Sequence, residues 1–497
     1  MFSKLTIICL FICIALMVGF FCRTHSQNVT GFILGGRSVG PWLSAFAFGT
    51  SYFSAVIFVG YAGQFGWKYG ISALWIGIGN ALLGSLLAWW VLGPRTRAMT
   101  QNLQSNTMPD FFGKRYKSRA LKTAAALIIF IFLIPYTASI YNGLSRLFEM
   151  AFDLPFEVCI IAMALITCIY VVLGGYMATV VNDFIQGIVM LFGIIAVIAA
   201  VVSTHGGLTE SLVQLSLVPH ETSPLNGCFV SFFGPDPLNL LGVVILTSLG
   251  TWGLPQMVQK FYAIKSGPAI KRSAIISTIF ALVVAGGSYF LGGFSRLFTD
   301  QIPLSASGEP LYDAIIPTML SGLPDVLVGL VIVLVLSASM STLSSLVLTS
   351  SSTLTLDLIK DRFTPNMSEK GQLVCMRGLI VMFVIISAVI ALLQYRNSLT
   401  FIAQLMGISW GALAGSFLGP FLWGLYSKKI STTAIWTSFA VGVGFTSLNM
   451  ILGLFGTPLI ASPVNAGAIA IVMSLVCVPL VSAVTKPVPF DLEKALR

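Results

Sequence analysis

The segment that decides the fold is Phe48-Gly49-Thr50-Ser51-Tyr52-Phe53-Ser54, a polar, glycine-containing interruption inside an apolar run at residues 42–66. A second interruption, Leu249-Gly250-Thr251-Trp252-Gly253-Leu254-Pro255, lies inside the apolar run at residues 237–262. A helix in lipid has to satisfy its own backbone hydrogen bonds, so an interrupted one is tolerated only where it faces protein or a polar cavity. Paired interruptions are typical of transporters built from two inverted halves.

The whole chain has the composition of an integral membrane protein. Of its 497 residues 56% are hydrophobic and only 9% are charged, and the mean hydropathy is +0.93, whereas about a quarter of the residues in a soluble protein are charged. Apolar runs of about 20 residues recur along the chain, which excludes a soluble enzyme, a disordered chain and a disulfide-stapled secreted module. The runs do not alternate apolar and polar residues, which excludes an outer-membrane barrel.

Thirteen apolar runs are long enough to be membrane-spanning helices. They lie at residues 5–22, 42–66, 70–93, 120–148, 155–174, 180–203, 237–262, 272–297, 322–350, 373–394, 399–425, 432–455 and 464–484. The interrupted runs are the second and the seventh, so five helices separate their starts and they enter the bilayer from opposite faces. The sequence therefore predicts an all-α integral membrane protein of about 13 transmembrane helices with an inverted 5+5 repeat.

This repeat also predicts the domain organisation of the chain. The expected parts are an extra N-terminal helix and linker (1–40), the first five-helix repeat (41–203), an extracellular loop (204–236), the second five-helix repeat (237–426), and two C-terminal helices with a short cytoplasmic tail (427–497).

The net charge of +10 is interpreted as a signal of membrane orientation. One set of alternate loops, together with the tail from residue 485, holds 22 of the 27 Lys and Arg residues, and Lys260 is counted in this set. Positively charged loops stay in the cytoplasm. We therefore expect a multi-pass protein of the plasma (inner) membrane with the N-terminus outside and the C-terminus cytoplasmic, and nucleic acid is not needed to explain the charge.

The ninth run carries an unusual set of hydroxyl groups in Ser341-Thr342-Leu343-Ser344-Ser345. Helical spacing places the hydroxyls of residues 341, 344 and 345 on one face, with Thr342 beside them. Neutral oxygen ligands suit a small monovalent cation that must also be released. Ser and Thr clusters in membranes also bridge helices without binding an ion, so both interpretations stay open at this point.

One carboxylate, Asp183, lies at the start of the sixth run, and no Lys or Arg occurs in the same run. Such a group costs about 2.5–3.5 kcal/mol at the centre of a membrane helix, so it usually faces a cavity or a counter-ion. Asp183 either caps the helix near the cytoplasmic interface or supplies negative charge to a cation that leaves towards the cytoplasm.

Four motifs resemble, in the same order along the chain, those of the sodium/solute symporter family. They are Phe32-Ile33-Leu34-Gly35-Gly36-Arg37-Ser38-Val39-Gly40-Pro41, Met108-Pro109-Asp110-Phe111-Phe112, Gly174-Gly175 through Asp183 and Gln186, and Ser341-Thr342-Leu343-Ser344. The resemblance covers nearly the whole chain and is greatest to the sodium/proline branch. It implies a fold of the leucine-transporter type and sodium-coupled import, by alternating access, of a small organic solute: an amino acid such as proline, or a monocarboxylate.

The resemblance also implies positions for the binding sites. The common sodium site maps onto the carbonyl oxygens of Thr50, Phe53 and Ala338 and the hydroxyls of Ser341 and Thr342. A second sodium, present in some members, maps onto Asp183, Ser341, Ser344 and Ser345, and the solute maps near Ser54, Tyr136, Trp252 and Trp410.

One residue departs from the pattern of the branch that the chain resembles most. Sodium/proline transporters carry an aspartate where this chain has Tyr52, which is uncharged at neutral pH. The departure weakens the expectation of proline, while the sodium site is expected to survive because it uses backbone oxygens of that segment.

Two other functions remain open on the residues alone. They are a proton-coupled carrier of the same fold, disfavoured by the lack of histidines in the apolar runs, and a transporter-like solute sensor without flux. An enzyme is not expected, because neither Ser/His pairing nor metal-ligand spacing occurs in the runs. The expected coupling ion is Na⁺ without an organic cofactor, and the expected partners are the solute and the lipid bilayer, with no nucleic acid and no obligate protein partner.

Overall fold

A computed structural model describes residues 2–152, 155–220, 226–304, 310–397 and 402–496. The longer helices are α1 (Phe2–Cys22), α3 (Pro41–Tyr52), α9 (Arg119–Phe152), α10 (Phe156–Ser203), α12 (Pro237–Gly253), α14 (Gly267–Gly292), α16 (Asp325–Thr353), α17 (Glu369–Asn397), α18 (Ile402–Tyr426), α19 (Thr432–Leu454) and α20 (Pro463–Val484). The shorter helices are α2 (Val29–Leu34), α4 (Ala62–Tyr69), α5 (Leu74–Gly79), α6 (Ala88–Val91), α7 (Gly93–Asn102), α8 (Met108–Arg115), α11 (Leu208–Ser216), α13 (Pro255–Ala263), α15 (Ile315–Ser321) and α21 (Leu492–Leu496). Wide π-helical segments are η3 (Val56–Tyr61), η5 (Asn80–Leu87) and η9 (Leu354–Phe363), and a 3₁₀ turn, η8, covers Tyr312–Ala314.

The helices account for the predicted number of membrane crossings. Among the described residues ten helical stretches are long and apolar enough to cross a membrane, or eleven if α12 and α13, bent by 47°, form one broken span. Val56–Asn102 and Phe156–Ser203 are 47 and 48 residues long, so each would measure about 70 Å if straight, against a hydrocarbon thickness of about 30 Å. Each contains a glycine with positive φ that breaks the helix, Gly70 (62°) and Gly175 (55°). If each of these two long stretches is counted as two crossings, the number of membrane crossings rises from eleven to thirteen.

Both predicted interruptions are confirmed. Helix α3 ends at Tyr52, Phe53 is extended (φ −84°, ψ 121°), and the chain becomes helical again in η3. Helix α12 ends at Gly253, Leu254 is extended (φ −80°, ψ 125°), and Pro255 starts α13. Proline is well suited to the first position of a helix because the N–H that it lacks would have no partner within the helix.

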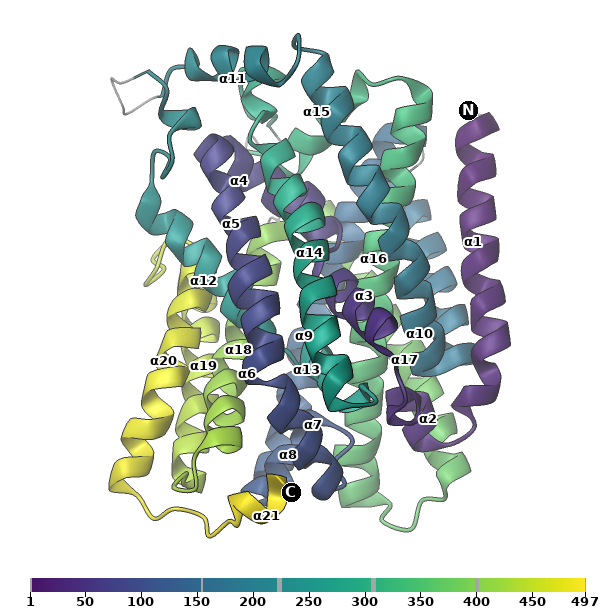
Figure 1. The fold of residues 1–497 in the computed structure, drawn as a ribbon, viewed down its shortest axis with the longest axis vertical. Helices are drawn as coiled ribbons and strands as arrows, with labels where there is room; N and C mark the ends of the chain where they lie inside the picture. The colour runs from purple at the N-terminus through teal and green to yellow at the C-terminus, as the bar shows by residue number, and fades with distance from the viewer. Residues whose placement is uncertain (1, 153–154, 221–225, 305–309, 398–401, 497) are drawn as a thin grey trace.

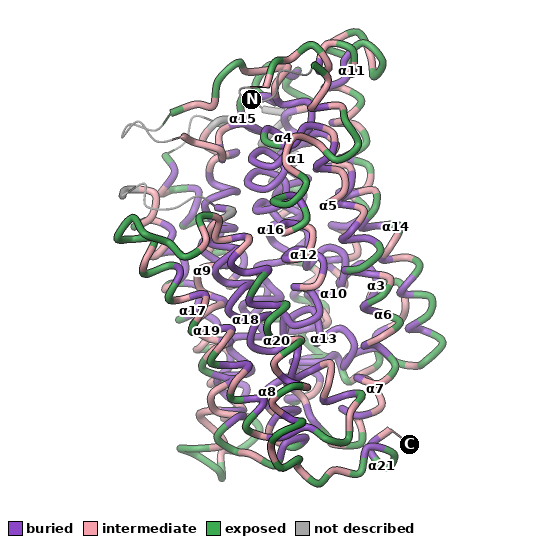
Figure 2. Tube along the Cα trace, turned by 90° about the vertical axis from the view of Figure 1, so that its left-hand side faces the viewer, coloured by how far each residue is buried: buried purple, intermediate pink, exposed green. Residues whose placement is uncertain are grey.

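The spans α16 and α18 are the most deeply buried in the bundle, and Figure 2 shows buried trace running through its middle. On the outside, large apolar side chains are exposed, including Phe21, Phe192, Leu238 and Val484. An exposed apolar exterior of this extent is what a lipid-facing surface requires. The interrupted α3 packs against α16, so the first break lies beside the hydroxyl-bearing helix in the interior.

The two ends of the bundle differ in what they carry. Figure 1 shows the termini at opposite ends, as an odd number of crossings requires. Helices α11 and α15 lie at the end with the N-terminus, and α7, α8 and α21 lie at the end with the C-terminus. The domain boundaries given above stay a prediction.

Candidate functional site

Five oxygen atoms from the first break and from α16 come together in the interior. The Ser341 hydroxyl lies 3.0 Å from the Thr50 carbonyl oxygen and 2.9 Å from that of Ala338. The Thr342 hydroxyl lies 3.3 Å from the Thr50 oxygen, 3.2 Å from that of Phe53 and 3.1 Å from that of Ala338. All five residues are fully buried. The structure thus brings together all the positions predicted for the common sodium site.

In these contacts there are more carbonyl acceptors than hydroxyl protons that can be donated to them. Ser341 and Thr342 each have one hydroxyl proton, yet their oxygens make five contacts with the carbonyls of Thr50, Phe53 and Ala338. A hydroxyl donates one hydrogen bond at a time, and the break in α3 removes the helical partners that its carbonyls would otherwise have. Five converging neutral oxygens can instead all be satisfied by one small cation. The geometry is therefore that of a cation site.

The residues predicted for a second sodium also lie in one buried region. Ser344 donates to the Ser341 carbonyl at 2.9 Å. Helix α10, which carries Asp183, packs against α16, and its Tyr170 hydroxyl donates to the Met340 carbonyl of α16 at 2.7 Å. Asp183 is fully buried, and neither carboxylate oxygen has a hydrogen-bond partner among the described residues. It lies within α10, two turns after the break at Gly175. Of the two roles considered from the sequence, that of a helix cap at the interface is therefore wrong.

Lys260 was missed by sequence reasoning, which counted it among the charges of a cytoplasmic loop. In the structure it lies in α13, only 1% exposed, and its ammonium donates to the Ser345 hydroxyl at 3.1 Å. The ammonium also lies 5.1 Å from the centre of the Tyr176 ring. A signal was available in the sequence, because Pro255 restarts a helix there and Lys260 lies inside its second turn rather than beyond it.

Three of the four residues predicted to contact the solute lie together. The Tyr136 and Trp410 rings meet edge to face with centroids 5.8 Å apart, and the Tyr136 side chain also contacts Ser54. The Tyr136 hydroxyl and the Trp410 indole N–H are buried and make no hydrogen bond of normal geometry with the described residues. The fourth, Trp252, donates its indole N–H to the Leu83 carbonyl at 2.9 Å, and its contact with the solute stays a prediction.

Tyr52 connects this group to the rest of the bundle. Its ring lies edge to face against Trp410, with centroids 5.9 Å apart. Its hydroxyl accepts a hydrogen bond from the Asn80 amide, and the Asn80 carbonyl oxygen accepts one from Ser248 at 3.1 Å. Tyr289 also contacts the Tyr52 hydroxyl. The wall around the candidate solute position is therefore built from neutral hydrogen-bonding groups and aromatic rings.

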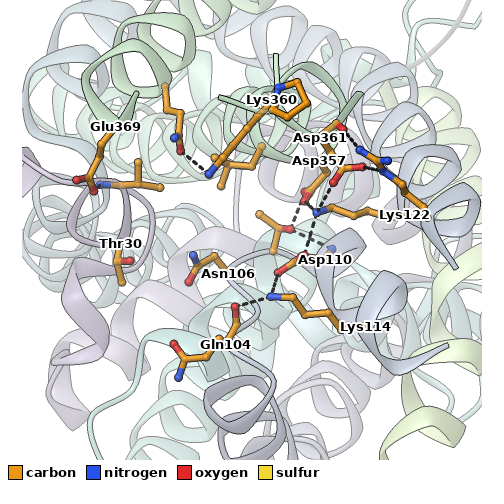
Figure 3. A pocket seen from close by; sticks show the side chains of 16 residues that line it. Thr30, Gln104, Asn106, Asp110, Lys114, Lys122, Asp357, Lys360, Asp361 and Glu369 are labelled. Atoms are coloured by element: carbon orange, nitrogen blue, oxygen red, sulfur yellow. Dashed lines mark hydrogen bonds and ion pairs between the residues drawn. The ribbon is translucent and has the colours of Figure 1, made fainter. Parts of the chain in front are cut away.

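Two cavities lie at opposite ends of the bundle. At the end with the C-terminus, a cavity of about 580 Å³ is lined by charged residues (Figure 3). Lys122 of α9 is 2.9 Å from Asp110 of α8 and 3.4 Å from Asp357 of η9, and Asp357 also accepts from Thr107 at 2.6 Å. This ionic cluster connects α8 and α9 to the end of the α16 span. At the other end, a cavity of about 630 Å³ lies among α4, α12, α18 and α20 and includes Lys68 and Asp236.

Comparison with known proteins places these features in a wider context. The model of the sodium:solute symporter family matches residues 32–442. The chain is 27% identical to the osmoregulated proline transporter OpuE of Bacillus subtilis, over 88% of this chain and 87% of that protein. It is 29% identical to a sodium/proline symporter of Staphylococcus aureus, over 85% of this chain and 81% of that protein.

Solved structures share the fold at lower identity. A Na⁺-coupled sialic acid symporter in a substrate-bound outward-open state superposes with a TM-score of 0.77 at 17% identity, over 97% of this chain and 98% of that one. A mutant form of the manganese transporter of Eremococcus coleocola gives a TM-score of 0.53 at 14% identity, over 94% of this chain and 96% of that one.

Proposed function

Because the chain belongs to the sodium:solute symporter family, we propose a specific assignment of its ion and solute sites. The protein is a sodium-coupled solute symporter that works by alternating access, and not an enzyme. We assign its coupling sodium to the carbonyl oxygens of Thr50, Phe53 and Ala338 and the hydroxyls of Ser341 and Thr342. The single observation that carries this assignment is that two hydroxyl protons face three carbonyl oxygens through five contacts.

The solute is assigned to the space beside Ser54, Tyr136 and Trp410. Two buried donors there, the Tyr136 hydroxyl and the Trp410 indole N–H, make no hydrogen bond of normal geometry with the described residues, and a buried donor without a hydrogen bond costs about 1–3 kcal/mol. A carboxylate on the solute would accept from both. Proline, carried by the two relatives named above, and a monocarboxylate have this group in common.

Sodium couples to transport because its ligands come from two helices. An ion held between α3 and α16 stabilises only those conformations in which the broken helix stays against α16. One sodium that crosses 100 mV supplies about 2.3 kcal/mol, and a tenfold concentration gradient adds about 1.4 kcal/mol. Together they sustain accumulation of a neutral solute by roughly several hundredfold.

The orientation in the membrane follows from the charge bias along the chain. The protein is a multi-pass membrane protein, and we assign it to the plasma membrane with the N-terminus outside and the C-terminus cytoplasmic. In this orientation the cavity among α4, α12, α18 and α20 is the outer entrance for the solute. The cluster around Lys122 then holds the cytoplasmic end closed.

Uptake into proteoliposomes tests the assignment. Radiolabelled proline and lactate are offered with an inward sodium gradient, and sodium is replaced by choline in the parallel sample. We expect sodium to stimulate uptake of at least one of them, and we expect pyrrolidine, which lacks the carboxylate, to compete poorly. Equal uptake in choline would refute sodium coupling, and strong competition by pyrrolidine would refute the carboxylate assignment.

A further inference from the structure

Four positively charged side chains gather at the end of the bundle that holds the C-terminus. They are Arg97 of α7, Lys265 between α13 and α14, and Lys271 and Arg272 near the start of α14, and we call them the basic cluster. The Arg97 guanidinium donates to the carbonyl oxygens of Ile264 at 3.1 Å and Lys265 at 2.8 Å, so it joins α7 to the link before α14. Lys265, Lys271 and Arg272 are exposed, and Arg97 is half-buried.

The basic cluster has no acidic residue to compensate it on the surrounding helices. Helices α3, α6, α7, α13 and α14 contain neither Asp nor Glu. None of the four side chains forms an ion pair within the part of the chain that the structure describes. A surface of one charge sign attracts ligands of the opposite sign. The cluster is therefore suited to an anion.

An apolar stripe begins on α14 where the positive charges end. Ile275 and Ile279 are each 58% exposed and Leu282 is 49% exposed. Their spacing places them on one face of the helix together with Lys271, and Arg272 lies beside that face. The helix rises by about 16 Å from Lys271 to Leu282, close to half of a hydrocarbon thickness of about 30 Å. Charge and stripe together thus match the headgroup and the acyl chains of one leaflet.

Two exposed tryptophans lie on either side of the α14 start. Trp42 of α3 is 59% exposed and Trp90 of α6 is 58% exposed, and both helices pack against α14 (Figure 1). Ser273 of α14 donates to the carbonyl of the residue before Trp42 at 2.9 Å. A Cβ atom at Gly93, one turn after Trp90, would lie 3.0 Å from Ile270. Both tryptophans are therefore near the depth of the basic cluster, and exposed tryptophan is typical of the headgroup region.

We propose that the basic cluster and the apolar stripe of α14 bind an anionic phospholipid. Its phosphate accepts from Lys271 and Arg272, and an acyl chain lies along Ile275 and Ile279. The lipid belongs to the leaflet at the end with the C-terminus, which is the cytoplasmic leaflet in the proposed orientation. A soluble phosphate would use the charges but leave the stripe and the two tryptophans without a role, whereas a phospholipid contacts all of them.

Native mass spectrometry of the purified full-length protein in detergent tests the proposal without sodium or solute. Phosphatidylglycerol and phosphatidylcholine with identical acyl chains are offered in equal amounts. We expect the wild type to retain phosphatidylglycerol in preference. Lys271→Gln/Arg272→Gln should weaken phosphatidylglycerol binding by roughly tenfold or more, and Lys271→Arg/Arg272→Lys, which keeps both charges, should bind like the wild type.

Lys428→Gln/Lys429→Gln is the matched control. It removes two positive charges from the same end of the bundle, where Lys428 pairs with Glu493, and it should leave phosphatidylglycerol binding unchanged. Equal retention of the two lipids by the wild type, or an equal loss in both glutamine double variants, would overturn the proposal. Displacement of phosphatidylglycerol by glycerol phosphate at matched concentration would also overturn it, because the occupant would then be a soluble phosphate. Since the assay contains no sodium and no solute, its result is independent of the proposed transport function.

Discussion

The hydroxyl of Ser341 lies 3.0 Å from the carbonyl oxygen of Thr50, although 291 residues separate them in the chain. The carbonyl is presented because α3 stops at Tyr52, and the hydroxyl is presented because α16 stays helical through the same depth of the bundle. A broken helix therefore provides the backbone oxygens of the proposed site, and an intact helix provides its side-chain oxygens.

Removing the two hydroxyls should weaken sodium binding. A hydrogen-bonding group that contacts a charge contributes about 1.5–3 kcal/mol, so Ser341→Ala or Thr342→Ala should raise the sodium concentration for half-maximal uptake by roughly ten- to a hundredfold. Sodium titrations of uptake in proteoliposomes measure this. Ser339→Ala on the same helix is the control, since the Ser339 hydroxyl is buried without a partner among the described residues, and an equal effect there would contradict the assignment.

Tyr52→Phe should affect the solute more than the ion. The substitution removes the acceptor of the Asn80 amide and leaves the backbone of α3 unchanged. A lost hydrogen bond of this kind costs about 1 kcal/mol, so we expect the KM for the solute to rise about fivefold with the sodium dependence unchanged.

The matched control for Tyr52→Phe is Tyr141→Phe. The Tyr141 hydroxyl is buried and has no hydrogen-bond partner among the described residues, so its removal should leave both parameters as they are. A shift in sodium affinity with an unchanged KM for the solute in Tyr52→Phe would place Tyr52 in the ion site instead.

Gly250→Ala tests the close packing of the second break against the solute group. A Cβ atom at residue 250 would lie 2.7 Å from Cε3 of Trp410, so the indole ring must move. Overpacking of this kind costs about 1–3 kcal/mol. We expect a lower melting temperature and a higher KM for the solute. Gly378→Ala, where a Cβ meets no atom within 4 Å, should change neither, and wild-type behaviour of Gly250→Ala would show that Trp410 does not position the solute.

The stability of the protein should depend on Asp313. Burial raises the pKa of Asp313 to about 6, although the Ile402 N–H at 3.2 Å and the charge of Arg146 both favour the carboxylate. The folded protein thus binds this proton more tightly than the unfolded chain, whose usual value is about 4. The free energy of unfolding should therefore rise as the pH falls from about 7 to about 4, by an amount on the order of 3 kcal/mol from this group.

Melting curves of wild type and Asp313→Asn, measured between about pH 7 and about pH 5, isolate this effect. The difference in melting temperature between the two proteins should be largest at the upper end of this range, where the wild type carries the buried charge, and should shrink at the lower end. A difference that does not change with pH would show that Asp313 does not titrate in this range.

The number of spans, both breaks and the hydroxyl-bearing run could be predicted from the sequence. These features are local, because each membrane crossing requires about 20 apolar residues. A polar break that contains glycine is tolerated only where it faces protein or a polar cavity. The prediction of the sodium ligands also depended on the family resemblance. Every residue has a backbone carbonyl, and the sequence alone does not show which of them bind an ion.

What only the tertiary structure decided was the direction of individual side chains. The Trp252 indole N–H donates to the Leu83 carbonyl, Tyr52 pairs with Asn80, and Lys260 points inward to Ser345 instead of lying in a cytoplasmic loop. A hydrophobic run shows that a segment crosses the membrane. It does not show how the helix is rotated about its axis or where the next helix lies. Those are set by packing between helices that are far apart in the chain.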